Sequence, residues 1–125
     1  MKIGEVAQRL DVPIHVLRHW DDMGVVVAGR STSGHRIYTE EHLYRLRILQ
    51  ACQGIGMSLA EIRKVLHRGA PGRATAITHQ LRRVRQQRIA LERTEQFLTH
   101  VIDCRHDLLT RCPACSAYAE DAAST

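Results

Sequence analysis

The feature that most constrains the fold of this chain is a long apolar stripe in its second half. The stripe uses alternating steps of three and four residues, at Ile77, Leu81, Val84, Leu91, Leu98 and Ile102, with Arg88 and Glu95 as exceptions. This spacing predicts one long helix. Because a single exposed helix cannot bury such a stripe by itself, we expect a partner helix from a second subunit. A helix that folds back on its own domain is the alternative.

The composition favours a helical, soluble protein. Of the 125 residues, 44% are hydrophobic but only 4% are aromatic, so the core must be built mainly from Leu, Ile, Val and Ala. We therefore expect a mainly α fold. No apolar run reaches the roughly 18 residues of a membrane span, and the charged start of the chain is unlike a secretory signal. The cytoplasm is the expected location, with no membrane partner.

The first 24 residues have the pattern of a helix, a tight turn and a second helix. Apolar residues recur at helical spacing in IGEVAQRL, the sequence DVP interrupts them, and IHVLRHWDDMG resumes the pattern. A helix-turn-helix reads DNA when the exposed face of its second helix carries groups that reach phosphates and base edges. That face offers His15, Arg18 and His19. An αα-hairpin with a solvated polar face is the alternative.

A short β-hairpin is expected over residues 25–42. β-Branched residues lie on both sides of RSTSG, and Gly34 can adopt a positive φ angle. Arg30, His35 and Arg36 lie at or beside the tip. A basic hairpin next to a helix-turn-helix is a wing, which can lie along the DNA backbone or enter the minor groove. The net charge of +5 permits a nucleic-acid partner but does not establish one.

Two further helices and a linker are expected between the hairpin and the long helix. Thr39 is the expected N-cap of the first, and the capping box of Ser58 and Glu61 opens the second, which Gly69 closes. The sequence GAPG then forms the linker. Cys52 has no ligand-type residue one turn away, so we interpret it as a buried small hydrophobe.

Three stretches of the chain closely resemble the MerR family of bacterial transcription regulators: IGEVAQRLDVPIHVLRHWDDMGVV, GRSTSGHRIYTEEHLYRLRIL and GIGMSLAEIRKVL. The resemblance covers residues 1 to about 68. It implies a winged helix-turn-helix DNA-binding domain over 1–70 and a dimerisation helix over 73–105, which forms an antiparallel coiled coil in a homodimer. A short Cys-rich effector segment over 106–125 would complete the chain.

The resemblance also implies DNA contacts and partners. By position, Arg18, Arg36 and Tyr38 would contact DNA, the last two within GHRIY, where the family usually has Gly-Tyr-Arg-x-Tyr. Members of the family typically bind promoters with over-long spacers, and on effector binding they distort the DNA so that the polymerase elements align. The implied partners are double-stranded promoter DNA, a second copy of the chain and RNA polymerase. His35 stands in place of the usual wing tyrosine.

Cysteines and histidines gather near the end of the chain, in HVIDCRHDLLTRCPACSAY. Cytoplasmic thiols stay reduced, which disfavours a disulfide framework. The resemblance implies that cysteines just beyond the dimerisation helix hold an effector ion in metal-responding members. The CPAC motif is a bidentate thiolate chelate, and Zn²⁺ or another thiophilic ion would need further ligands. The candidates are Cys104, Cys112 and Cys115, with His106 as first choice for the fourth ligand, His100 as second, and His79 of an antiparallel partner as third.

Other interpretations of the cysteines stay open at this point. An unbroken helix to Arg111 would hold Cys104 roughly 12 Å from Cys112, so a shared ion requires a chain reversal within DLLTRC. Without it, Cys112 and Cys115 would need ligands from elsewhere, His79 of the partner helix included, or would act as a redox-active dithiol. A purely structural zinc site and an organic effector are further alternatives. A thiol–disulfide oxidoreductase is a remote one, because CPAC lacks the βαβ context of such enzymes, and we expect the protein not to be an enzyme.

Overall fold

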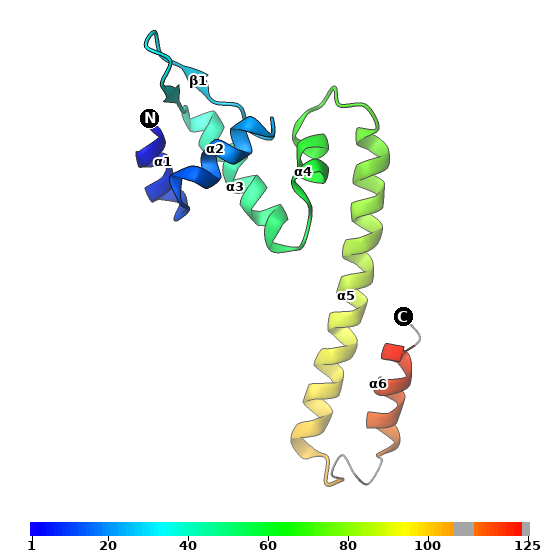
Figure 1. Ribbon diagram of the computed structural model, residues 1–125. Helices are drawn as coiled ribbons and strands as arrows, with labels where there is room; N and C mark the ends of the chain where they lie inside the picture. The colour runs from blue at the N-terminus through cyan, green and yellow to red at the C-terminus, as the bar shows by residue number, and fades with distance from the viewer. Residues whose placement is uncertain (107–111, 124–125) are drawn as a thin grey trace. The chain divides into compact units, whose positions relative to one another are not determined.

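The protein is mainly helical in its computed structural model, which describes residues 1–106 and 112–123 (Figure 1). The expected mainly α fold is confirmed. The chain forms two compact units, Met1–Thr78 and His79–Thr125. Among the described residues, no helix has the length and apolar character needed to cross a membrane.

The first unit is a helix-turn-helix followed by a hairpin and two more helices. Its elements are α1 (Ile3–Leu10), α2 (Ile14–Asp22), β1 (Gly29–Arg30), β2 (Arg36–Ile37), α3 (Glu40–Gly54) and α4 (Leu59–Leu66). Asp11 ends α1 in the left-handed conformation, with φ of 53°, and Pro13 precedes α2. β1 and β2 pair in an antiparallel hairpin whose turn uses Gly34 at φ of 84°. The helix-turn-helix and its wing are therefore present as predicted.

One apolar core joins the helices of the first unit. Its most deeply buried members on α1 to α4, at most 3% exposed, are Val6, Leu17, Trp20, Leu46, Leu49 and Ile62. Burying a side chain of this size contributes roughly 1.5–3 kcal/mol, so these contacts supply most of the stability of the unit. Cys52 is half-buried and packs against the same core, which agrees with its interpretation as a small hydrophobe.

The N-terminal caps of α3 and α4 follow the sequence prediction. Thr39 Oγ1 accepts a hydrogen bond from the backbone N–H of His42 at 3.3 Å. Ser58 Oγ accepts one from the N–H of Glu61 at 3.2 Å, and Glu61 Oε1 accepts one in return from the N–H of Ser58 at 3.1 Å. These bonds satisfy N–H groups that have no partner inside the helix, and each helix therefore begins at a defined residue.

α4 ends earlier than the sequence pattern predicts. It stops at Leu66, not at Gly69, because His67 already has extended backbone angles. The His67 ring explains the change: its Nε2 donates to the carbonyl oxygens of Gly24 and Val25, at 3.0 and 3.2 Å. A side-chain bond to the turn after α2 thus takes the place of a glycine cap.

The second unit contains most of α5 (Arg73–Asp103) and all of α6 (Pro113–Ala123). From Leu81 onward the apolar stripe of α5 faces solvent, with exposure between 39% at Val84 and 82% at Ile102. Gln80 is the one buried residue among those of α5, all of which the structure describes. The stripe is therefore not covered by the described part of its own chain.

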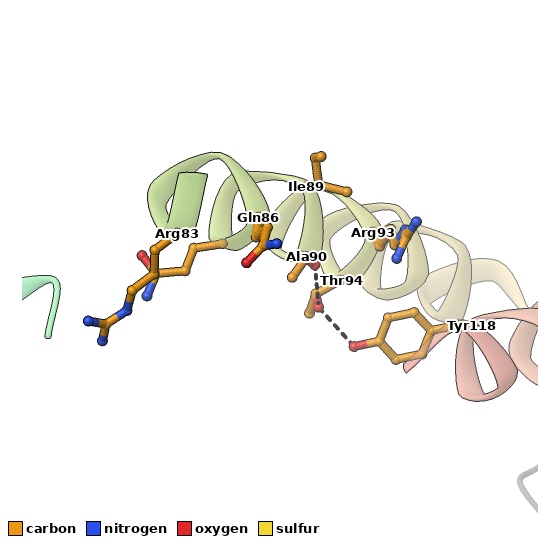
Figure 2. Close-up of a pocket in the computed structure, with 8 residues that line it drawn as sticks. Arg83, Gln86, Ile89, Ala90, Arg93, Thr94 and Tyr118 are labelled. Carbon is orange, nitrogen blue, oxygen red and sulfur yellow. Dashed lines mark hydrogen bonds between the residues drawn. The ribbon is translucent and has the colours of Figure 1, made fainter. Parts of the chain in front are cut away.

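α6 is a helix that the sequence pattern did not predict. Pro113 occupies its first position, where the missing N–H of proline costs nothing. The Tyr118 ring stacks on Phe97 of α5 with centroids 4.4 Å apart. Figure 2 shows the Tyr118 hydroxyl directed at Thr94 of α5, and the two hydroxyl oxygens are 2.8 Å apart. These contacts hold α6 beside the last turns of α5.

Candidate nucleic-acid interface and metal centre

The exposed face of α2 carries the three residues predicted to read DNA. His15, Arg18 and His19 are all exposed. Within residues 1–106 and 112–123, their side chains make no hydrogen bond or ion pair. The opposite face of α2 is fixed by the burial of Leu17 and Trp20. A rigidly held helix therefore presents donor groups that are free to bind an anionic partner.

The wing presents a second set of basic groups. Its turn is closed by the N–H of Ser31, which donates to the His35 carbonyl at 2.8 Å, and by the N–H of Gly34, which donates to the Ser31 carbonyl at 2.9 Å. The His35 side chain is exposed at this turn. The Arg30 side chain is 50% exposed, and its Nη1 donates to the Gly34 carbonyl at 3.3 Å. Both can reach a ligand that lies along the tip.

Arg36 occupies a different environment from the other basic residues of the wing. Its side chain is only 17% exposed, and its Nε donates to Asp21 Oδ2 at 2.6 Å. Its Nη2 donates to Asp22 Oδ1 at 3.1 Å. The guanidinium is thus engaged by the end of α2. The sequence analysis missed Asp21, although its position four residues after Leu17 places it on the buried face of the helix.

Tyr38 lies in the core and does not face solvent. It is 1% exposed, and its ring packs edge-on against His42 with centroids 5.9 Å apart. Its hydroxyl is buried without a hydrogen-bond partner among the described residues. Burial, and then the negative charge of Asp21, raise the pKa of Tyr38 above its usual value. The resemblance-based assignment of Tyr38 to the DNA-contacting set therefore has to be revised: the aromatic ring anchors the base of the wing.

Replacing Tyr38 with phenylalanine should raise the free energy of unfolding by about 1 kcal/mol. The buried hydroxyl gives up its hydrogen bonds to water on folding and forms none within the protein to replace them. DNA affinity should not change. Urea denaturation and a DNA-binding titration measure the two quantities. A loss of DNA affinity in a folded Tyr38→Phe protein would restore the hydroxyl as a DNA contact.

Four potential metal ligands meet where α5 ends and α6 begins. His100 and Cys104 are one helical turn apart, and the Cys104 N–H donates to the His100 carbonyl at 3.0 Å. Cys112 immediately precedes α6, and Cys115 lies in its first turn. The ligand atoms of all four residues lie within 4.8 Å of one another. Neighbouring ligand atoms around tetrahedral Zn²⁺ are about 3.7 Å apart, so a small contraction would complete the site.

Cys112 has the environment of a thiolate. Its pKa is lowered to about 6, first by a hydrogen bond from the backbone N–H of Cys115 and then by its contact with His100, whose Nε2 is 3.4 Å from the sulfur. Backbone N–H groups at a helix N-terminus stabilise an anionic sulfur in this way. Burial and the neighbouring Cys112 sulfur raise the pKa of the Cys115 thiol. These contacts favour the thiolate form of Cys112 over that of Cys115.

The geometry favours a different fourth ligand from the first choice. His100, which was the second choice, belongs to the cluster, whereas His106, the first choice, does not. His106 follows the end of α5 at Asp103, and its Nδ1 lies 3.8 Å from the Cys104 sulfur, so it contacts one member of the cluster without belonging to it. His79 is about 31 Å along α5 from His100 at 1.5 Å per residue, so within one chain it is remote.

Cys104 and Cys112 lie close together, as a shared ion requires. Cys104 and Cys112 have their sulfur atoms within 4.8 Å, which an unbroken helix to Arg111 would forbid. Residues 107–111, where the reversal was expected, lie outside the described residues. The donor set fits a thiophilic ion, because three sulfur atoms and one imidazole nitrogen suit a soft or borderline metal in tetrahedral geometry.

A winged helix-turn-helix with an unpaired basic face, followed by a long exposed helix, is the architecture of a DNA-binding regulator. Comparison with known protein families identifies which class of DNA-binding regulator this is. The family described as "MerR HTH family regulatory protein" matches residues 1–69, and the one described as "MerR, DNA binding" matches residues 43–101. The chain belongs to the MerR family of regulators.

Individual relatives agree with this placement. The chain is 37% identical over 68 residues to the HTH-type transcriptional regulator ZntR homolog of Haemophilus influenzae, covering 54% of this chain and 50% of that one. It is 26% identical over 115 residues to the HTH-type transcriptional regulator CueR of Vibrio cholerae, covering 90% and 81%. The chain thus spans about half the length of some curated relatives. These relatives are transcription regulators and not enzymes, in agreement with the expectation from the sequence.

A solved structure supports the fold. The crystal structure of HiNmlR, a MerR family regulator lacking the sensor domain and bound to promoter DNA, matches with a TM-score of 0.67 at 24% identity. The match covers 81% of this chain and 86% of that one. The first unit, Met1–Thr78, is a smaller share of the 125 residues than the 81% that the match covers. The match therefore extends into the second unit.

Proposed function

We propose that this protein regulates transcription by binding promoter DNA as a homodimer, and that a thiophilic metal ion, Zn²⁺ above all, is its effector. The observation that carries the metal assignment is the meeting of one imidazole and three sulfur atoms within 4.8 Å. Family resemblance implies RNA polymerase as a further partner. The cytoplasm is the location that fits such a regulator.

The proposed DNA contacts come from the exposed groups of α2 and the wing. They are His15, Arg18, His19, Arg30 and His35. Arginine can donate two hydrogen bonds to one guanine in the major groove, which makes Arg18 the best candidate for base recognition. The wing residues suit the phosphate backbone or the minor groove.

The proposed homodimer follows from the uncovered face of α5. Large apolar side chains stay exposed along five turns and more, as the values for Leu91 (69%) and Leu98 (57%) illustrate. A groove of about 730 Å³, shown in Figure 2, lies on another face of α5, beside α6. It is lined by Arg83, Gln86, Gln87, Ile89, Ala90, Arg93, Thr94 and Tyr118. A helix from a second copy would bury the stripe, which shares no residue with this groove.

The proposed metal site links two helices. An ion bound there would join the end of α5, through His100 and Cys104, to the start of α6, through Cys112 and Cys115. α6 already packs on α5 through Tyr118, so occupancy would fix α6 against the helix proposed to carry the dimer contact. This is a physical route from metal binding to the dimer, and from the dimer to the spacing of the two DNA-binding units.

Selection of binding sites from a random duplex library tests the DNA-binding proposal. The protein should enrich a pseudo-palindromic sequence, and Arg18→Ala should weaken binding to it by about 1–3 kcal/mol per lost bidentate contact. Footprinting with Zn²⁺ and with a chelator then tests the effector: a metal-dependent change in DNA distortion supports regulation, whereas identical footprints favour a structural ion. Failure to enrich any sequence would contradict the proposal.

A further inference from the structure

Asp21 is an acidic residue in the interior of the first unit. Its side chain is 6% exposed, and it lies on the same face of α2 as the buried Leu17. It also lies in the last turn of the helix, where the helix dipole disfavours a negative charge. A carboxylate in such a place requires cationic partners to offset its lost hydration.

Both strands of the wing supply those partners. From β2, Arg36 Nε contacts Asp21 Oδ2 at 2.6 Å, and from β1, Arg30 Nη2 lies 3.6 Å from the same oxygen. Asp22 adds a second acceptor for Arg36, at 3.1 Å. One buried carboxylate therefore joins both strands of the hairpin to the helix that exposes Arg18.

The two arginines differ in how easily they can leave this carboxylate. Arg36 makes the short bond and is 17% exposed, so its departure would leave Asp21 buried without its main partner, which is costly. Arg30 makes only the long contact and is 50% exposed. Exposed pairs of this kind contribute about 0–1 kcal/mol, so Arg30 can exchange Asp21 for another anion at little cost.

We propose that Asp21 and Arg36 position the wing on α2 without touching DNA, and that Arg30 leaves Asp21 to bind a DNA phosphate. The proposal rests on the DNA-binding function proposed above. Side chains that recognise DNA must be held within about 0.5 Å of the geometry in which they bind. In the proposed complex, α2 and the wing contact neighbouring parts of the duplex. The ion pair that fixes one against the other therefore controls operator discrimination. Arg36 becomes a positioning residue in place of the direct contact that family resemblance suggested.

The salt dependence of DNA binding separates the two roles, because each lost phosphate contact lowers the slope of log Kd against log salt by about 0.9. The probe is the duplex enriched from the random library. Arg30→Ala should lower the slope by about 1.8 for the two subunits of a dimer. Arg36→Gln should leave the slope unchanged.

Operator discrimination supplies the second measurement. Arg36→Gln should raise the Kd for the enriched duplex about tenfold, which is the effect of one mismatched base pair. The Kd for a random duplex should rise by a smaller factor, so the discrimination between the two duplexes falls. Arg36→Gln alone leaves the buried Asp21 carboxylate without its main partner, which can unfold the protein. The double variant Asp21→Asn, Arg36→Gln removes both charges and keeps groups that hydrogen-bond, so it controls for this effect. It should bind no worse than Arg36→Gln alone, again with an unchanged slope. Arg82→Ala, at an exposed arginine of α5, is the matched control and should behave as the native protein.

Two results would overturn the inference. One is a lower slope in Arg36→Gln or in the double variant, which would make Arg36 a phosphate contact. The other is an additive loss of affinity in the double variant, which would mean that Asp21 and Arg36 act separately. If the native protein enriches no sequence, the proposed function itself fails and the inference with it. On an enriched duplex, a lower slope in Arg36→Gln or an unchanged slope in Arg30→Ala contradicts the inference alone.

Discussion

Cys112→Ser should abolish tight metal binding and remove the thiolate-to-metal charge-transfer band of the Co²⁺-substituted protein. Cys112 contacts His100 and immediately precedes α6, and its lowered pKa of about 6 favours the thiolate form. Serine lacks a ligand that suits a thiophilic ion. We expect the affinity for Co²⁺ and Zn²⁺ to fall by more than about a hundredfold, because changes in outer-shell groups alone cost 10–100-fold.

Matched variants make this metal prediction specific. Cys52→Ser changes a cysteine of the core of the first unit and should leave the spectrum unchanged. His100→Ala should weaken binding, whereas His106→Ala should not, because only His100 belongs to the cluster. A charge-transfer band that survives Cys112→Ser would contradict the site. Loss of the band in His79→Ala would mean that two subunits share the ion.

The fold of the first unit could be predicted from sequence because its signals are local. The apolar spacing of α1 and α2, the Gly34 turn and the Ser58 capping box each depend on residues close in the chain. The end of α4 could not be predicted in this way. It is set by His67, whose ring bonds to Gly24, a residue far away in sequence.

The candidate sites depend more on contacts that the sequence does not reveal. His100 and His106 both lie within about a turn of Cys104 if the helix continues, and only its end at Asp103 separates them. Arg36 and Arg30 look equally basic in sequence, yet one is engaged by a buried carboxylate and the other is half exposed. The residue types show which of these groups can bind a metal ion or a phosphate. Tertiary packing decides which of them are placed to do so.

Glutamates at positions 91 and 98 should convert the proposed homodimer to a monomer. Leu91→Glu and Leu98→Glu place two carboxylates on one face of α5, two turns apart, in the stripe that a second copy would bury. Burying an unpaired carboxylate in an apolar seam costs several kcal/mol, so the double variant should not pair. Sedimentation velocity at micromolar concentration measures the change. Gln96→Glu adds charge at an exposed polar site of the same helix and should stay dimeric.

Loss of the dimer should carry a larger penalty for DNA than any single contact. When two linked DNA-binding units occupy two half-sites, the second binds at a high effective concentration, which can strengthen binding by about 10²–10⁴. The Leu91→Glu, Leu98→Glu protein should lose this gain on a full operator, while its weak binding to an isolated half-site stays unchanged because α2 and the wing are intact. A double variant that sediments as a dimer, or a monomer that binds the full operator like the native protein, would show that α5 does not hold two copies together on DNA.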